Sequence, residues 1–298
     1  MKITRIESFR HKLGEGPIWD QIEQALYGTD VLGRKIWRYD PRNGDYDAWD
    51  MGEMVSSISL RETGGALLAL AGGIYFFDFD NGKKTFVSGL GCENKDLKLN
   101  DGKSDRAGRF VYGNVHAPGL RAEAGLFSIE PDLRAIRRDC DLIITNGPCW
   151  SKDGNIFYFT DSLRKSIYAY DYDIGSGDVA NRRLFATTAR FGGIPDGATV
   201  DAEGYLWTAL CEGSKILRIK PDGTVVMAID MPTRLVSSVM FGGADLDRLF
   251  VTSMDGAAVA AEIPMAAVNP VKSDENSGAL FVIDGLGIKG MEEYRFRG

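Results

Sequence analysis

A unit of two apolar segments joined by a glycine-containing turn recurs six times along the 298-residue chain. A third apolar segment follows each copy after a short gap. Equivalent positions at the start of the first segments are Glu15, Ser57, Asn100, Asn146, Asp196 and Ser238. Successive copies therefore lie 42 to 50 residues apart. A period of this length is typical of the blades of a β-propeller.

The residue types within each copy predict strands rather than helices. Val, Ile, Phe and Tyr dominate the apolar segments, and no long segment has a 3.6-residue period. Turns such as SKDGN and DAEGY suit hairpins, while YDPRNGDY and KPDGT supply turns before a fourth strand. We therefore predict an all-β, six-bladed β-propeller in a single domain over residues 1–298. A large β-sandwich is the alternative, but it does not explain the regular spacing.

Two segments lie outside the six copies. ITRIESF precedes the first copy, and MEEYRFRG follows the last one. Pairing of N- and C-terminal strands within one sheet would close the ring and hide two sheet edges, so we expect these ends to pair.

Composition excludes several classes of function. The net charge is −7, and no Lys/Arg block interleaves with aromatic residues, so nucleic acid is not an expected partner. The N-terminus lacks the apolar core of a signal peptide, and the apolar run Thr63–Phe77 is too short to span a membrane as a helix. Four scattered cysteines without a CxxC pair, and only two histidines, argue against a zinc site of Cys/His type. Reduced thiols and a cytoplasmic location are expected.

Four of the six equivalent positions carry a carboxylate or a carboxamide. The first strand of each blade lines the channel of a propeller, so Glu15, Asn100, Asn146 and Asp196 converge at one mouth. Carboxylate and carboxamide oxygens suit Ca²⁺, Mg²⁺ or Mn²⁺, and zinc is tolerated through carboxylates. A cation would also neutralise buried carboxylates that repel each other. Singly, Asn146-Gly and Asp196-Gly are equally typical of turns, but their shared repeat phase favours a site.

At these residues the chain resembles the SMP-30/gluconolactonase/regucalcin family. The resemblance extends over nearly the whole chain, and its motifs are LGEGPIWD, LNDGKSDRAGRF, ITNGPCWSKDG, IPDGATVDAEGYLW and GLGIKGMEEYRF. It implies a six-bladed propeller, hydrolysis of a sugar lactone, and one divalent cation held by Glu15, Asn146 and Asp196. The substrate-contacting Asn of the family corresponds to Asn100.

The chain departs from the family pattern at two places near the expected substrate. Lys98 stands where many members have Arg, and a Lys ammonium cannot make the planar bidentate contact of a guanidinium. The stretch GNVHAPG lacks the acidic substrate contact that many members carry. With Lys98, His116 and Arg121 in this region, we expect a lactone with an anionic substituent, carboxylated or sulfonated. A surface loop whose charges face water is the alternative.

The expected reaction is metal-assisted hydrolysis of a cyclic ester. Asp196 is the candidate to activate the attacking water or to carry a proton to the ring oxygen, and Asn100 and Lys98 would orient hydroxyl groups. A hydrolase of organophosphates or aryl esters on the same scaffold is one alternative. A non-enzymatic calcium-binding regulatory protein is another, because a fold alone does not fix a function. The expected partner is a small lactone, and the expected state is a monomer or a weak homo-oligomer.

Overall fold

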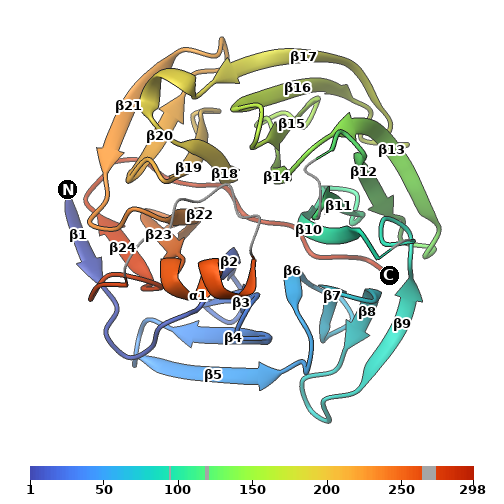
Figure 1. The fold of residues 1–298 in the computed structure, drawn as a ribbon, viewed down its shortest axis with the longest axis horizontal. Coiled ribbons are helices and arrows are strands. Elements are labelled where there is room, and N and C mark those ends of the chain that lie inside the picture. Colours follow the sequence, from blue (N-terminus) through green and yellow to red (C-terminus); the bar gives the residue numbers. More distant parts are fainter. Residues whose placement is uncertain (94, 118–120, 264–272) are drawn as a thin grey trace.

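The computed structural model describes residues 1–93, 95–117, 121–263 and 273–298. Within them, six four-stranded antiparallel sheets surround a central opening (Figure 1), which confirms the six-bladed propeller. Blades 1 to 3 contain β2 (Gly14–Asp20), β3 (Ala25–Asp30), β4 (Lys35–Asp40), β5 (Asp45–Asp50); β6 (Val55–Leu60), β7 (Ala66–Leu70), β8 (Gly73–Phe77), β9 (Lys84–Ser88); and β10 (Leu97–Ser104), β11 (Phe110–His116), β12 (Ala124–Ile129), β13 (Ala135–Leu142). Blades 4 and 5 contain β14 (Thr145–Trp150), β15 (Ile156–Asp161), β16 (Ser166–Tyr172), β17 (Val179–Thr187); and β18 (Ile194–Val200), β19 (Leu206–Cys211), β20 (Lys215–Ile219), β21 (Val225–Asp230).

The sixth blade closes the ring with strands from both ends of the chain. It contains β22 (Val236–Gly242), β23 (Arg248–Ser253), β24 (Phe281–Asp284) and, outermost, the N-terminal strand β1 (Lys2–Arg5). β1 pairs antiparallel with β24, Lys2 opposite Asp284 and Arg5 opposite Phe281. Closure by N- and C-terminal strands is thus confirmed. The expectation that MEEYRFRG supplies the C-terminal partner was wrong, because the sequence FVID takes that place.

Buried apolar side chains hold each blade to the next. Six clusters in the described part of the chain each join two neighbouring blades, and the interface between blades 6 and 1 is as aromatic as the rest. There the Trp19 ring stacks on Phe250 with ring centroids 5.7 Å apart. Burial of such large side chains stabilises the closed ring.

A β-bulge interrupts the first strand of every blade. The pairing register between first and second strands shifts after Glu15 in β2, after Leu99 in β10, after Asn146 in β14 and after Pro195 in β18. The same shift occurs in β6 and β22. A bulge leaves residues unpaired and re-aims a side chain, which is why bulges concentrate beside active sites. The Gly-Pro and Asx-Gly pairs of the repeat thus lie inside strands rather than in turns between strands.

Helices are short within the described residues. A 3₁₀ turn covers Ala189–Phe191, and α1 (Gly256–Glu262) follows β23 with Asp255 as its N-cap. No helix in these ranges has the length and apolarity needed to cross a membrane.

We call the residues after β24, 285–298, the C-terminal segment. In the view of Figure 1 this segment crosses the far end of the channel, behind the central opening. Its backbone bonds to blades 6 and 5, where Gly290 N donates to Leu246 O and Ala202 N donates to Lys289 O. Farther on, Phe296 N donates to the blade 2 carbonyl of Leu60. The segment therefore ties separate blades together after the ring has closed.

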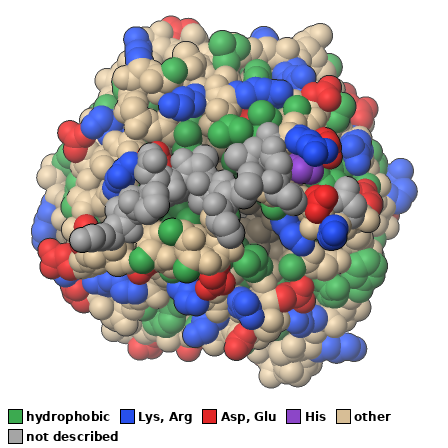
Figure 2. All heavy atoms as spheres, in the orientation of Figure 1, with side chains coloured by type: hydrophobic (Ala, Val, Ile, Leu, Met, Phe, Trp, Pro, Cys, Tyr) green, Lys and Arg blue, Asp and Glu red, His purple; other side chains and the backbone are tan. Residues whose placement is uncertain are grey.

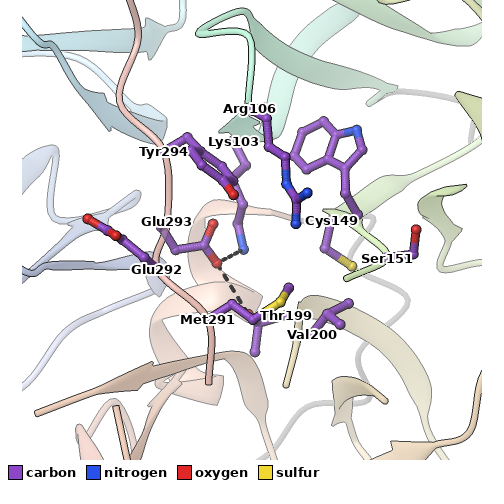
Figure 3. A pocket seen from close by; sticks show the side chains of 11 residues that line it. Lys103, Arg106, Cys149, Ser151, Thr199, Val200, Met291, Glu292, Glu293 and Tyr294 are labelled. Carbon is purple, nitrogen blue, oxygen red and sulfur yellow. Dashed lines mark hydrogen bonds and ion pairs between the residues drawn. The ribbon is translucent and has the colours of Figure 1, made fainter. Parts of the chain in front are cut away.

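A buried ion pair anchors this segment inside the channel (Figure 3). Lys103 of β10 donates to Glu293 Oε1 at 2.9 Å and to Ala198 O at 3.2 Å, and Thr199 Oγ1 donates to the same Glu293 oxygen. Burial lowers the pKa of Lys103, but Glu293, with smaller contributions from Cys149 and Asp101, raises it, and the net pKa is raised. The raised pKa favours the charged ammonium form of Lys103.

Glu293→Gln should destabilise the protein by about 3–5 kcal/mol, because it leaves the Lys103 ammonium buried without its anion. Urea unfolding at neutral pH measures the loss. Glu292→Gln, at the exposed neighbouring acid, is the matched control and should have little effect. The double variant Lys103→Met/Glu293→Leu should regain most of the stability. Equal stability of the Glu293→Gln and Glu292→Gln proteins would contradict a structural role for the pair.

Candidate functional site

A cavity of about 490 Å³ lies at the other mouth of the channel, where the first strands begin. Figure 2 shows this face hollowed near its centre, with hydrophobic side chains beside the hollow. Polar side chains from blades 1, 3, 4 and 5 form what we call the floor of the cavity: Glu15, Asn100, Asp101, Asn146, Ser162 and Asp196. The structure thus brings together the four residues that shared one repeat phase in the sequence.

The bulges explain why glycine follows four of the floor residues, Glu15, Asp101, Asn146 and Asp196. Gly147 has a φ of +57°, a left-handed conformation, and a Cβ there would lie 2.8 Å from Asp196 O. At Gly197 a Cβ would lie 1.9 Å from Ser238 Oγ in the next blade. Only glycine therefore lets neighbouring first strands approach closely enough for Asn146 and Asp196 to share the cavity floor.

A chain of hydrogen bonds across three blades orients the two carboxamides. Ser162 Oγ donates to Pro195 O at 2.6 Å, so it must accept from Asn146 Nδ2 at 2.9 Å. Asn146 Oδ1 consequently faces the other way and accepts from Asn100 Nδ2 at 2.9 Å. Asn100 Nδ2 also donates to Thr145 O, which uses both of its amide hydrogens.

Asp101 is a third carboxylate of the floor that sequence reasoning missed. Its Oδ1 accepts from Gly102 N at 2.8 Å, and its Oδ2 accepts from Gly147 N at 2.9 Å. Two backbone donors, one from each of two adjacent bulges, therefore hold the carboxylate in place. Asp101-Gly102 repeats the Asx-Gly pattern of positions 146 and 196, so this pattern could have revealed it. Ser162, also missed, had no comparable pattern.

The environment of the floor disfavours the ionised forms of its three carboxyl groups. Burial, followed by the neighbouring Asp196 and Asp101 carboxylates, raises the pKa of Glu15 well above its ordinary value. Burial and Asp101 do the same to the pKa of Asp196. Burial also raises the pKa of Asp101, although its backbone donors and Lys103 oppose the shift. Each carboxyl group would be ionised far more readily with a positive charge beside it.

The donor set fits a hard divalent cation. Glu15 and Asp196 line the cavity as buried carboxyls, and Asn146 presents a carboxamide oxygen whose direction the Ser162 relay fixes. All are oxygen donors of the type that Ca²⁺, Mg²⁺ and Mn²⁺ prefer. In the described ranges no three His, Cys, Asp or Glu side chains form a ready cation-binding cluster. The Asn146 oxygen offers a further ligand beside the Glu15 and Asp196 carboxyl groups.

The basic residues expected near the substrate separate in the structure. Lys98 lines the cavity on the blade 3 side. His116 is buried at the end of β11 with Nε2 3.6 Å from Glu123 Oε2, outside the described lining of the cavity. Arg121 is exposed and donates to Glu123. Lys98 alone of the three therefore lies where a cavity-bound ligand could reach it.

The sequence is similar to a known protein family and to several of its characterised members. The family model described as the SMP-30/Gluconolactonase/LRE-like region matches residues 13–255. Regucalcin of Gallus gallus is 32% identical over 304 aligned residues, which cover 100% of this chain and 99% of that protein. The 6-deoxy-6-sulfogluconolactonase of Pseudomonas putida is 36% identical over 244 residues, 81% of this chain and 83% of the relative.

A solved structure agrees over the full length. A luciferin-regenerating enzyme superposes with a TM-score of 0.90 at 27% identity, covering 100% of this chain and 99% of its own. The arrangement of blades is therefore shared across proteins whose names indicate different substrates.

In chelator-treated protein, stability should fall as pH rises above the ordinary carboxyl range. The raised pKa values mean that the folded state favours the protonated carboxyls, so their stabilisation is complete below the ordinary carboxyl range and is lost as pH climbs through the raised values. Asp196→Asn should flatten this dependence and raise the melting temperature at pH 8. Melting curves at several pH values measure both effects, and parallel pH profiles for the two proteins would contradict the assignment.

Proposed function

The chain belongs to the SMP-30/gluconolactonase/LRE-like family, and we propose from this premise that it hydrolyses sugar lactones with a divalent cation held by Glu15, Asn146 and Asp196. The observation that carries the proposal is the floor itself, where the buried Glu15 and Asp196 carboxyl groups, the half-buried Asp101 carboxyl group and two oriented carboxamides meet in one cavity. A relative at 36% identity is named as a sugar lactonase, which supports the same reaction.

A bound divalent cation supplies a Lewis acid that polarises an ester carbonyl and stabilises negative charge on its oxygen. The protein side chains do the rest. In this proposal Asp196 accepts the proton of the attacking water and returns a proton to the ring oxygen as the acyl carbon–oxygen bond breaks. The product is the open-chain hydroxy acid.

Asn100 has a defined part in this scheme. Because both hydrogens of its Nδ2 already bond to Thr145 O and Asn146 Oδ1, it can offer a substrate only the carbonyl oxygen Oδ1. We propose that Oδ1 accepts a hydrogen bond from a sugar hydroxyl. Asn100 also holds Asn146, so it links the substrate to the cation-binding residue.

Asp196→Asn should lower kcat for glucono-1,5-lactone by about 10²–10⁴-fold, the usual contribution of a proton-transferring side chain. Glu15→Gln should abolish tight binding of Ca²⁺ or Mn²⁺, measured directly by titration calorimetry. Proton release in weak buffer reports lactone opening. Full turnover by Asp196→Asn would rule out its catalytic role, and unchanged ion binding by Glu15→Gln would rule out the ligand set.

The substituent on the lactone is a further part of the proposal. Lys98 lines the cavity, and the 36% identical relative carries the name of a sulfonated sugar lactonase. We propose that an anionic substituent at this side of the lactone bonds to the Lys98 ammonium.

Lys98→Met should lower kcat/KM for a sulfonated or carboxylated sugar lactone by about tenfold, in keeping with the 1.5–3 kcal/mol of a charge-assisted hydrogen bond. Turnover of neutral glucono-1,5-lactone should change much less. Lys95→Met, at an exposed lysine nearby, is the matched control. Equal losses of kcat/KM on the anionic and the neutral lactone would show that Lys98 does not bind the anionic substituent.

A calcium-binding protein without enzymatic activity is the second candidate, because several full-length relatives are named regucalcin. Tight Ca²⁺ binding with no hydrolysis of any lactone would favour it. The free state of all four cysteines agrees with the predicted cytoplasmic location, which stays a prediction.

A further inference from the structure

The cavity lining is apolar around much of its rim, and on the side of Lys98 it includes Leu99, Val115 and Ile144. Its polar side chains are the floor residues together with Lys98, Ser56 and Glu262. Across the opening, blades 1, 2 and 6 together with α1 present what we call the apolar wall: Leu13, Val31, Met54, Met254, Val259 and Ile263. In Figure 1, α1 and β10, which carries Lys98, lie on opposite sides of the central opening.

The apolar wall is one packed cluster. Leu13, Met254 and Val259 are buried, with Val259 only 2% exposed, and the three other members pack against them. α1 contributes Val259, and its N-cap Asp255 accepts from Ala257 N and Ala258 N, which stabilises the first turn of the helix. An apolar surface thus stands beside the floor.

Polar atoms on this side are few and already engaged. Ser56 Oγ donates to Ala69 O at 3.3 Å, and the Glu262 carboxylate accepts from Lys12 Nζ at 3.0 Å. A sugar hydroxyl directed at the wall would lose its hydrogen bonds to water without a replacement, which costs about 1–3 kcal/mol. An alkyl or aryl group there would instead release water from apolar surface.

We propose that the enzyme also takes lactones that bear an alkyl or aryl substituent, with the substituent on the apolar wall and the ring ester over the floor. This inference rests on the proposed lactone hydrolysis and extends its substrate class. Water adds to the carbonyl carbon, the acyl bond to the ring oxygen breaks, and that oxygen takes up the proton. A 5-alkyl δ-lactone thereby gives a 5-hydroxyalkanoate.

The test is a chain-length series of δ-lactones, from δ-hexalactone to δ-dodecalactone, assayed with the Mn²⁺-loaded protein beside glucono-1,5-lactone. Each added methylene should raise kcat/KM about three- to fourfold until the wall is covered. Values that stay within twofold along the series, while glucono-1,5-lactone is hydrolysed, would overturn the inference and leave the proposed function standing.

Variants of the wall locate the effect. Val31→Thr/Val259→Thr keeps side-chain volume but adds hydroxyls, and it should reduce the ratio of kcat/KM for δ-decalactone over δ-hexalactone by about tenfold. Val226→Thr, at an exposed valine of β21, is the matched control and should keep the parent ratio. An unchanged ratio in the double variant would overturn the placement of the substituent.

A binding measurement tests the apolar wall separately from lactone hydrolysis. If no lactone at all is hydrolysed, the proposed function fails. The affinities of 5-hydroxydecanoate and 5-hydroxyhexanoate, measured by calorimetry, then test whether the apolar wall binds an alkyl chain. At least tenfold tighter binding of the longer acid supports the apolar wall as a binding surface. Equal affinities overturn it.

Discussion

The bulge in the first strand of each blade is the constraint on which the site depends. An unbroken first strand would alternate its side chains between the two faces of the sheet, each packed against a neighbouring blade. The register shift after Glu15 and Asn146 turns these side chains toward the channel mouth instead. Because the ring is closed at β1 and β24, the positions of the bulges relative to one another are fixed. Ring closure and local bulges together create the floor.

The floor is stable only with help from elsewhere. Glu15, Asp101 and Asp196 bring three carboxyl groups into a buried volume, where burial and mutual repulsion raise their pKa values. Inside the channel, the Lys103 ammonium partly opposes this charge and is held by Glu293 of the C-terminal segment. The crossing of that segment behind the ring thus contributes to the electrostatics of the site at the front. Gathering these carboxyl groups in one place has an energetic cost when no cation lies beside them.

The two sides of the cavity divide recognition into separate tasks. In the proposed function the floor positions the ester and its nearest hydroxyl, and Lys98 supplies a charge at one side. The apolar wall offers only burial, which tolerates many shapes. Relatives of similar fold carry names that refer to a sulfonated sugar lactone and to luciferin. A reactive centre fixed by bulges, with walls free to vary, is consistent with such diversity on one scaffold.

The repeat pattern alone predicts the propeller and the convergence of Glu15, Asn100, Asn146 and Asp196, because a repeat carries its phase in local residue patterns. The other features depend on long-range packing. The pairing of β1 with FVID, the crossing of the C-terminal segment, and the relay through Ser162 all join residues far apart in the chain. The separation of His116 from Lys98 and the gathering of the apolar wall are likewise products of ring closure. No local pattern records such contacts, since they depend on which surfaces face each other once every blade is packed.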